Sequence, residues 1–346
     1  MEKRRAILGN QDNFFHAEKL YYINKLDDKP RRQAKNSRMT TRRSITIAAW
    51  SLLLPVALWV TSLPDNTVSA ENKKTVLEHA DQIEGGENPG PSGTTVPYRS
   101  AVGNVRFLHG ETILQCDRAT DFPDSERIDL TGHIIIKDKV VETRADRGVY
   151  HTDREAGELW GNVRGRVIED SLTVKSARAT FDQKKNELWL FDDAIAWQRG
   201  RQLSGDSIRV QIREIAGKKK VDEIQVFGHA FLAARDSLSG SPALHDQLSG
   251  RQLTANMDER SRLRKVVAIK NARSLYHIYD DKNQPSGVNF TSGDRIRMFF
   301  AEGKLDRILV TGGAIGKEYP NYLRNDPAIN LPGFRLRDKE KPVFAP

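Results

Sequence analysis

Residues 203–234 read LSGDSIRVQIREIAGKKKVDEIQVFGHAFLAA, and this stretch decides the fold. Apolar side chains occupy alternate positions on both sides of its lysine-rich centre: Ile208, Val210, Ile212, Ile224 and Val226. A period of two is typical of a strand with one buried face. The polar centre suits a hairpin turn. The stretch therefore predicts two antiparallel strands that pack one face against a core.

The same phrase recurs along residues 101–316. Each unit begins at Asp or a substitute and ends at Gly or a substitute: Asp117 and Gly132, Asp146 and Gly161, Ala177 and Asp192, Asp206 and Gly228, Gln252 and Asn271, Asp294 and Gly312. The same alternation appears in the last unit at Ile296, Met298, Phe300, Ile308 and Val310. A fixed repeat of this size indicates stacked supersecondary units.

The repeats predict an all-β domain. No stretch of 101–316 keeps a period of 3.6, so crossover helices and a parallel α/β sheet are not expected. About twelve short antiparallel strands remain, in about six degenerate two-strand repeats. We expect them to form a jelly roll or folded-over sheet. Long insertions near 236–248, Ser-Ala-Arg at 176–178 and Gly-Arg-Gln at 250–252 depart from the pattern and leave the strand register open there.

The recurring Gly and Asp residues are predicted to build corners rather than an active site. Glycine permits positive φ where a strand turns, and Asp can bond nearby backbone amides. A feature that recurs in every unit is structural, since catalysis needs only one site. His133 and His229 each follow a repeat glycine and are predicted to be turn residues.

The N-terminal residues are predicted to target the chain to a membrane. Residues 45–63 are 19 residues without a charge, long enough to cross a bilayer core as a helix. Residues 1–44 are basic, with 12 Lys and Arg against 5 Asp and Glu before residue 44. The positive-inside rule then places the N-terminus in the cytoplasm and residue 64 onward across the membrane.

Two interpretations of 45–63 stay open. It is either a transmembrane signal anchor or the apolar region of a cleaved signal peptide. Small residues precede Glu71, so a signal peptidase could cut after Ala70. The basic region is long for a signal peptide, but a start at Met39 instead of Met1 would give ordinary proportions.

Composition divides the rest of the chain. Residues 64–100 contain Gly-Gly and Pro-Gly-Pro and are predicted to be a flexible linker. Residues 317–346 contain five prolines and are predicted to be a tail with little regular structure, from which Phe334 and Leu336 dock on the body. From residue 71 onward the net charge is only +3, from 43 basic and 40 acidic residues, so nucleic acid is not expected as a partner.

The sequence offers no catalytic or metal motif. Metalloprotease, CxxC and nucleophile-elbow patterns are lacking in 101–316, and the eight histidines have no metal-ligand spacing. The single cysteine, Cys116, is predicted to be buried and structural. We expect no enzyme activity, no metal and no cofactor.

Three phrases resemble the OstA-like/LptA superfamily, which includes LptA, LptC and the N-terminal domain of LptD. They are TRADRGVYHTDREAGELWGNVRG at 143–165, the LSGDSIRVQI and DEIQVFGHAFLAA segments within 203–234, and FTSGDRIRMFFAEGKLDRILVTGGAIG at 290–316. The long units and charged turns look most like OstA-like proteins of Bacteroidota and Chlorobi-type bacteria. The resemblance covers about 101–316.

The resemblance implies a periplasmic β-jelly roll whose interior holds lipopolysaccharide acyl chains. Such modules stack edge to edge by strand addition and bridge the two membranes. The implied ligand is lipopolysaccharide or a similar amphiphile, and the implied partners are other Lpt-type jelly rolls, plus the inner membrane if 45–63 is retained. The acyl-chain groove is then expected at the inward residues: Ile208, Val210, Ile212, Ile224, Val226, Ile296, Met298, Phe300, Ile308 and Val310.

Other interpretations remain. Arg209, Arg295 and Arg297 point outward and could meet lipid phosphates, although a solvated face is the simpler account of each. The inward residues could equally form a closed core. The chain could also be a single-span regulator of the anti-sigma type with a β sensor domain, or a structural scaffold that carries no lipid.

Overall fold

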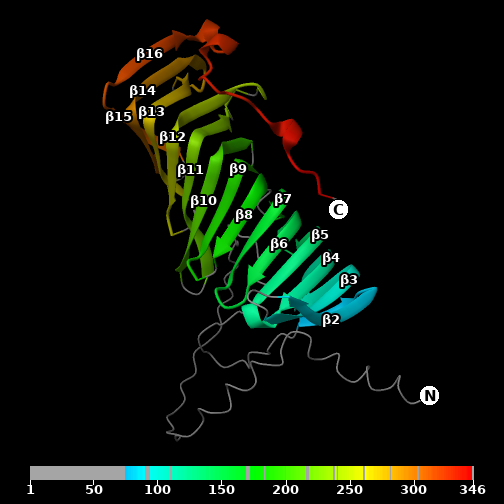
Figure 1. Cartoon of the computed structure of the whole chain (residues 1–346). Coiled ribbons are helices and arrows are strands. Elements are labelled where there is room, and N and C mark those ends of the chain that lie inside the picture. The colour runs from blue at the N-terminus through cyan, green and yellow to red at the C-terminus, as the bar shows by residue number, and fades with distance from the viewer. Residues whose placement is uncertain are drawn as a thin grey trace, which may run out of the picture.

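A computed structural model shows one long, curved sheet of 16 strands (Figure 1). It describes residues 75–344 except 90–93, 110, 140, 169–171, 183, 199, 216–217, 237, 240, 260–261, 281 and 302–303. Within these residues the regular structure consists of strands and short 3-10 turns, and no helix is long and apolar enough to cross a membrane. The predicted all-β antiparallel fold is confirmed. The predicted membrane segment 45–63, the basic region 1–44, Met39 and Ala70 lie outside the described residues.

The strands follow one another along the sheet in sequence order with antiparallel neighbours. Their bounds are β1 Thr75–His79, β2 Gln82–Pro89, β3 Thr95–His109, β4 Thr112–Phe122, β5 Arg127–Lys137, β6 Val141–His151, β7 Ala156–Val167, β8 Leu172–Asp182, β9 Glu187–Gln198, β10 Arg201–Ile215, β11 Lys218–Arg235, β12 His245–Met257, β13 Leu263–Tyr279, β14 Pro285–Ala301, β15 Lys304–Thr311 and β16 Ile315–Pro320.

Each edge of the sheet is formed by two short strands instead of one long strand. At one end β1 and β2 pair side by side with the two halves of β3. At the other end β15 and β16 pair in the same way with β14. The sheet therefore has two edges, each divided at the line where the strands bend.

The prediction of a linker over 64–100 is wrong for its described part, and the β domain is longer than 101–316. Residues 75–79, 82–89 and 95–100 are strand residues of β1, β2 and β3. Gly85, Gly86 and Pro89 suggested coil, but β2 lies at an edge of the sheet, where a residue needs a ladder on one side only. A side chain at Gly86 would meet the Tyr98 ring at 3.3 Å, so its absence lets the two strands pack.

The strands bend where the repeats predicted corners. At each corner two consecutive residues adopt positive φ, as in Gly132 (+75°) with His133 (+45°), or Gly228 (+63°) with His229 (+46°). The ladder register shifts at the same place, for example between Thr131 and Ile134. The corners fold each long strand into two halves, so that the sheet has two leaves that face one another.

The corner aspartates act differently from the prediction. They were expected to bond backbone amides, but their side chains lie against the glycine. In three units, those of Asp117, Asp146 and Asp206, the aspartate bonds the side chain that follows the glycine. Asp117 Oδ2 is 2.8 Å from His133 Nδ1, and Asp146 Oδ2 accepts a hydrogen bond of 2.8 Å from Asn162 Nδ2. The glycine is required because an added Cβ at Gly132 would lie 2.0 Å from Asp117 Oδ2. The two histidines are turn residues, as predicted.

The irregular third and fifth units do not interrupt the sheet. Asp192 and Asp193 make the third corner with φ of +63° and +62°, opposite the shift between Lys175 and Arg178. Lys270 and Asn271 make the fifth with φ of +60° and +57°. The departures from the repeat therefore change the residues at the corner, while the strands stay paired on both sides of it.

The chain after β16 is fastened along the outer face of one leaf. Residues 317–320 belong to β16, and beyond them the tail makes only 3-10 turns at Asn321–Leu323, Pro327–Ile329 and Asp338–Glu340. Figure 1 shows the tail running back along the sheet from β16 towards β7. Phe334 packs against Phe231 with ring centroids 6.1 Å apart, as predicted, whereas Leu336 stays 38% exposed.

Candidate functional site

On the inner face of one leaf, residues of neighbouring strands pair across the sheet and form two parallel rows. This is the leaf that contains Ala119 of β4 and Leu130 of β5. One row runs across β4–β10 as Ala119, Leu130, Gly148, Leu159, Ala179, Leu190 and Ile208. The other runs across β5–β10 as Ile128, Tyr150, Gly157, Phe181, Leu188 and Val210. Successive strands thus place one side chain each into the same line, as cross-strand pairing requires.

The ten residues predicted for the acyl-chain groove all lie on this inner face, in the C-terminal half of the sheet. Ile208, Val226, Ile296 and Val310 continue the first row, and Val210, Ile224, Met298 and Ile308 continue the second. Ile212 and Phe300 lie two residues after Val210 and Met298, at the next inward position of β10 and β14. All ten belong to one packed cluster, in which Ile208 is 2% and Ile296 0% exposed.

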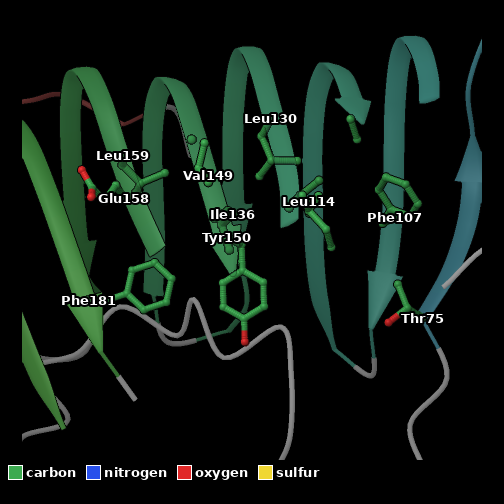
Figure 2. A pocket seen from close by; sticks show the side chains of 13 residues that line it. Thr75, Phe107, Leu114, Leu130, Ile136, Val149, Tyr150, Glu158, Leu159 and Phe181 are labelled. Atoms are coloured by element: carbon green, nitrogen blue, oxygen red, sulfur yellow. The ribbon is translucent and has the colours of Figure 1, made fainter. Parts of the chain in front are cut away.

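An apolar hollow lies in the N-terminal half instead, between the two leaves of β3–β8 (Figure 2). The space between its lining side chains is about 600 Å³ when the open solvent at its mouth is included, so only part of this volume is enclosed. The residues that line it are Thr75, Phe107, Leu114, Ala119, Ile128, Leu130, Ile136, Gly148, Val149, Tyr150, Glu158, Leu159 and Phe181. Both leaves contribute to the lining. Phe107, Leu114 and Ile136 pair with one another on one leaf, and Leu130 and Leu159 lie on the other leaf, across the corners.

Two glycines explain why space remains at this place. Gly148 and Gly157 occupy the inner rows at positions where β10 carries Ile208 and Val210. An added Cβ at Gly148 would lie 2.9 Å from Leu159 Cδ2, and one at Gly157 would lie 2.6 Å from Phe181 Cζ. The neighbouring side chains have moved partly over the glycines, and the remaining volume is the hollow.

Tyr150 and Phe181 stand together on one side of the hollow (Figure 2). Their rings stack with centroids 6.0 Å apart and an angle of 11° between the planes. Phe181 also packs against the C-terminal cluster, so it marks the boundary between the hollow and the filled half of the interior. Burial, and secondly the charge of Glu155, raises the pKa of the Tyr150 phenol, which therefore stays protonated.

One buried cysteine lies in the cluster beside the hollow. Cys116 is 4% exposed in the cluster beside the hollow, as predicted, and burial raises the pKa of its thiol to about 12. A thiol that stays protonated is a poor nucleophile. Among the described residues no group of three or more His, Cys, Asp or Glu side chains could hold a metal ion.

Arg209, one of the three arginines predicted to point outward, has acidic and polar partners on the sheet. Arg209 bonds Glu187 and donates to Gln211 Oε1 at 2.8 Å. Glu142 on β6 is 1% exposed and accepts from both Arg144 and Arg166. Burial acts to raise the pKa of Glu142, but these two arginines outweigh it and hold that pKa below its usual value.

The tail is held by two buried glutamines on the outer face. Gln202 donates from Nε2 to the Arg335 carbonyl at 2.8 Å and accepts from the Arg337 amide at 2.7 Å. Gln247 accepts from the Leu331 amide at 2.9 Å in the same way. Arg337 and Glu340 then form an ion-pair cluster with Lys175 on β8 and Asp193 at a corner.

The hollow was not predicted from the sequence, although a signal for it is present. The phrases TRADRGVYH and AGELW place glycine at an inward position of a strand, where the other units carry Ala, Leu, Ile or Val. Bulky residues at alternate positions mark the packed half of the interior. Glycines at the equivalent inward positions mark the strands that surround the hollow.

Comparisons with known proteins show a structural likeness and no match at the level of sequence. The chain matches no protein-family model and no curated protein. Among solved structures it is similar to LptH of Pseudomonas aeruginosa, described as the LptA-homologous periplasmic component of the lipopolysaccharide transport device. The TM-score is 0.28 and the identity 13%, over 41% of this chain and 96% of that one.

Proposed function

We propose that this protein is a periplasmic lipid-binding component of lipopolysaccharide transport and outer-membrane biogenesis. It holds acyl chains in the hollow between the leaves of β3–β8. The observation that carries the proposal is an apolar hollow inside a sheet whose other half is tightly packed. Burial of an alkyl chain contributes roughly 0.8 kcal/mol per CH₂ group, so a long chain supplies substantial affinity without any charged contact.

The two edges of the sheet support a bridging role. Each of the four edge strands carries a large apolar side chain that is more than two-fifths exposed: Val76 at 51%, Ile83 at 51%, Leu309 at 42% and Ile315 at 55%. An edge strand also presents backbone groups on its outer side to a further strand. Other jelly-roll modules of the same kind are therefore proposed to pair with these edges and to extend the interior from one module to the next.

Site-specific photocrosslinking in the native host tests the lipid site. A photoreactive residue is placed at Phe107 and at Leu130 in the hollow, with Arg147 on the outer face as the control. Adducts with lipopolysaccharide are expected at Phe107 and Leu130 and not at Arg147. Adducts at Val210 and Met298 as well would extend the site along the inner rows to the residues predicted from the sequence.

The opposite result is equally clear. If the protein is folded and exported but Phe107 and Leu130 give no lipid adduct, the lipid-carrier proposal is wrong. The single-span regulator or the structural scaffold would then be the better account of the same sheet. Neither of these two needs a ligand between the leaves.

A further inference from the structure

The hollow contains a buried hydroxyl group without a partner. Tyr150 is 6% exposed, and its Oη has no hydrogen-bond partner among the described residues. The other hydroxyl that lines the hollow is different, since Thr75 Oγ1 bonds His109 Nδ1 at 2.9 Å. Figure 2 shows the Tyr150 ring beside Phe181, with the hydroxyl at the end of the ring farther from Leu114 and Leu130. Buried polar groups nearly always have a partner, so this one requires an explanation.

The surroundings of Tyr150 define what a partner would be. The phenol stays protonated at neutral pH and therefore offers a hydrogen-bond donor. Glu155 acts on the phenol as a nearby negative charge, which disfavours an anionic group at the same point. Glu158, which also lines the hollow, is paired with Arg178 at 3.6 Å. The hydroxyl thus faces a site suited to a neutral oxygen carried by an apolar molecule.

We propose that Tyr150 is a specificity-determining residue that selects acyl chains bearing a hydroxyl group over plain alkyl chains. This inference rests on the proposed lipid site and names the class of chain that the site prefers. A hydroxyl within a chain is costly to bury in an apolar cavity unless it is hydrogen-bonded. The Tyr150 hydroxyl supplies that bond, and a plain chain leaves it unpaired.

Phe181 and Gly157 give the contact its position. The Tyr150 ring is stacked on Phe181, and Gly157 is its register partner on β7. Because Gly157 has no side chain, the Phe181 ring can lie over it, where an added Cβ would be 2.6 Å from Phe181 Cζ, and this fixes the ring against which Tyr150 stacks. The hydroxyl is therefore held by packing at one place along the hollow and can discriminate between chains by the position of their oxygen.

The test compares tetradecanoate with hydroxytetradecanoates whose hydroxyl lies at different carbons along the chain. Binding is measured by displacement of the apolar fluorophore N-phenyl-1-naphthylamine. Wild-type protein is expected to bind at least one hydroxylated chain roughly 3- to 10-fold more tightly than tetradecanoate, the effect of one net hydrogen bond. Tyr150→Phe keeps the ring and removes the hydroxyl, so the ratio of the affinities for the hydroxylated and the plain chain should fall to about one.

Tyr98→Phe is the matched control, because it removes the same hydroxyl from a β3 tyrosine outside the hollow. It should retain the preference. Thermal unfolding of unliganded Tyr150→Phe is expected at or above the wild-type midpoint, since the variant loses an unpaired buried group. A marked fall in that midpoint would mean that the hydroxyl has a partner within the protein and would overturn the inference.

The outcomes separate the inference from the proposed function. If all chains bind wild-type protein equally, or if Tyr150→Phe keeps the preference, the inference is wrong and the lipid site stands. If no chain displaces the fluorophore, the lipid site itself is wrong and the inference fails with it.

Discussion

At the scale of single residues, the two halves of the interior should respond differently to the same substitution. Ala119 lines the hollow, whereas Ala268 is 0% exposed between Leu253 and Ile296 in the filled half of the same row. Ala268→Leu should lower the free energy of unfolding by about 1–3 kcal/mol, because a packed core resists added volume. Ala119→Leu should cost less than about 1 kcal/mol and should weaken fluorophore binding, because the new side chain occupies the hollow.

Urea unfolding of both variants measures the difference. The proteins serve as controls for each other, since the chemical change is identical and both alanines are buried on the inner face. Equal losses of stability would contradict the distinction between a hollow and a filled half. Unchanged fluorophore binding by Ala119→Leu would place the probe elsewhere on the molecule.

The corners offer a second test at this scale. Gly132→Ala should destabilise the protein for two reasons: a left-handed conformation costs a non-glycine residue about 1–3 kcal/mol, and the added methyl group overlaps Asp117. Asp117→Ala removes the overlap but not the backbone strain. The double variant should therefore lose less stability than the sum of the two single changes. Strict additivity would show that the aspartate does not press on the glycine.

At the scale of elements, the tail depends on charge. Glu340 bonds Arg337, which holds the pKa of the Glu340 carboxyl at about 2, well below its ordinary value of 4.5. A lowered pKa in the folded state means that the contribution to docking is complete above pH 4.5 and is lost as the pH falls towards about 2. The Leu331 and Arg337 amides, which donate to Gln247 and Gln202, should lose protection from hydrogen exchange over that range.

Glu340→Gln provides the control for the tail. It removes the charge and should weaken protection of the same amides already at pH 6, with less change on further acidification. Amides in the β9–β10 ladder should stay protected in both proteins at pH 6, which separates release of the tail from general unfolding. An acid profile of the variant that matches the wild type would assign the pH dependence to another group.

Elements could be predicted from the sequence where the interactions that form them lie within one hairpin. Alternation at Ile208 and Val210 and the pairing of Asp117 with Gly132 both act within a hairpin, so they could be predicted. The strand β2 could not, because Gly85, Gly86 and Pro89 are acceptable in a strand only at an edge, and the edge is a property of the whole sheet. The hollow is also non-local, since Gly148 leaves space only through its neighbours in the row, Leu130 and Leu159.

At the scale of the whole molecule, the sheet behaves as a linear array. Each strand contacts its sequence neighbours, so stability is nearly a sum of local terms and can differ along the chain. The N-terminal half contains the hollow, whereas the half that contains Ile208 and Ile296 is packed by side chains across the same rows. Amide hydrogens of β4–β7 should therefore exchange faster than those of β10–β13 in the unliganded protein.

A bound chain should reverse this order locally. A ligand that binds only the folded state stabilises it by mass action, and in a linear array the gain is confined to the strands it touches. Saturating tetradecanoate should slow exchange in β4–β7 and leave β10–β13 unchanged, as read by mass spectrometry of peptides from each half. Ala119→Leu, which fills the hollow, should abolish the difference. Slower exchange in β10–β13 instead would place the chain among the residues that the repeat pattern selected, and would mean that the filled half opens to receive it.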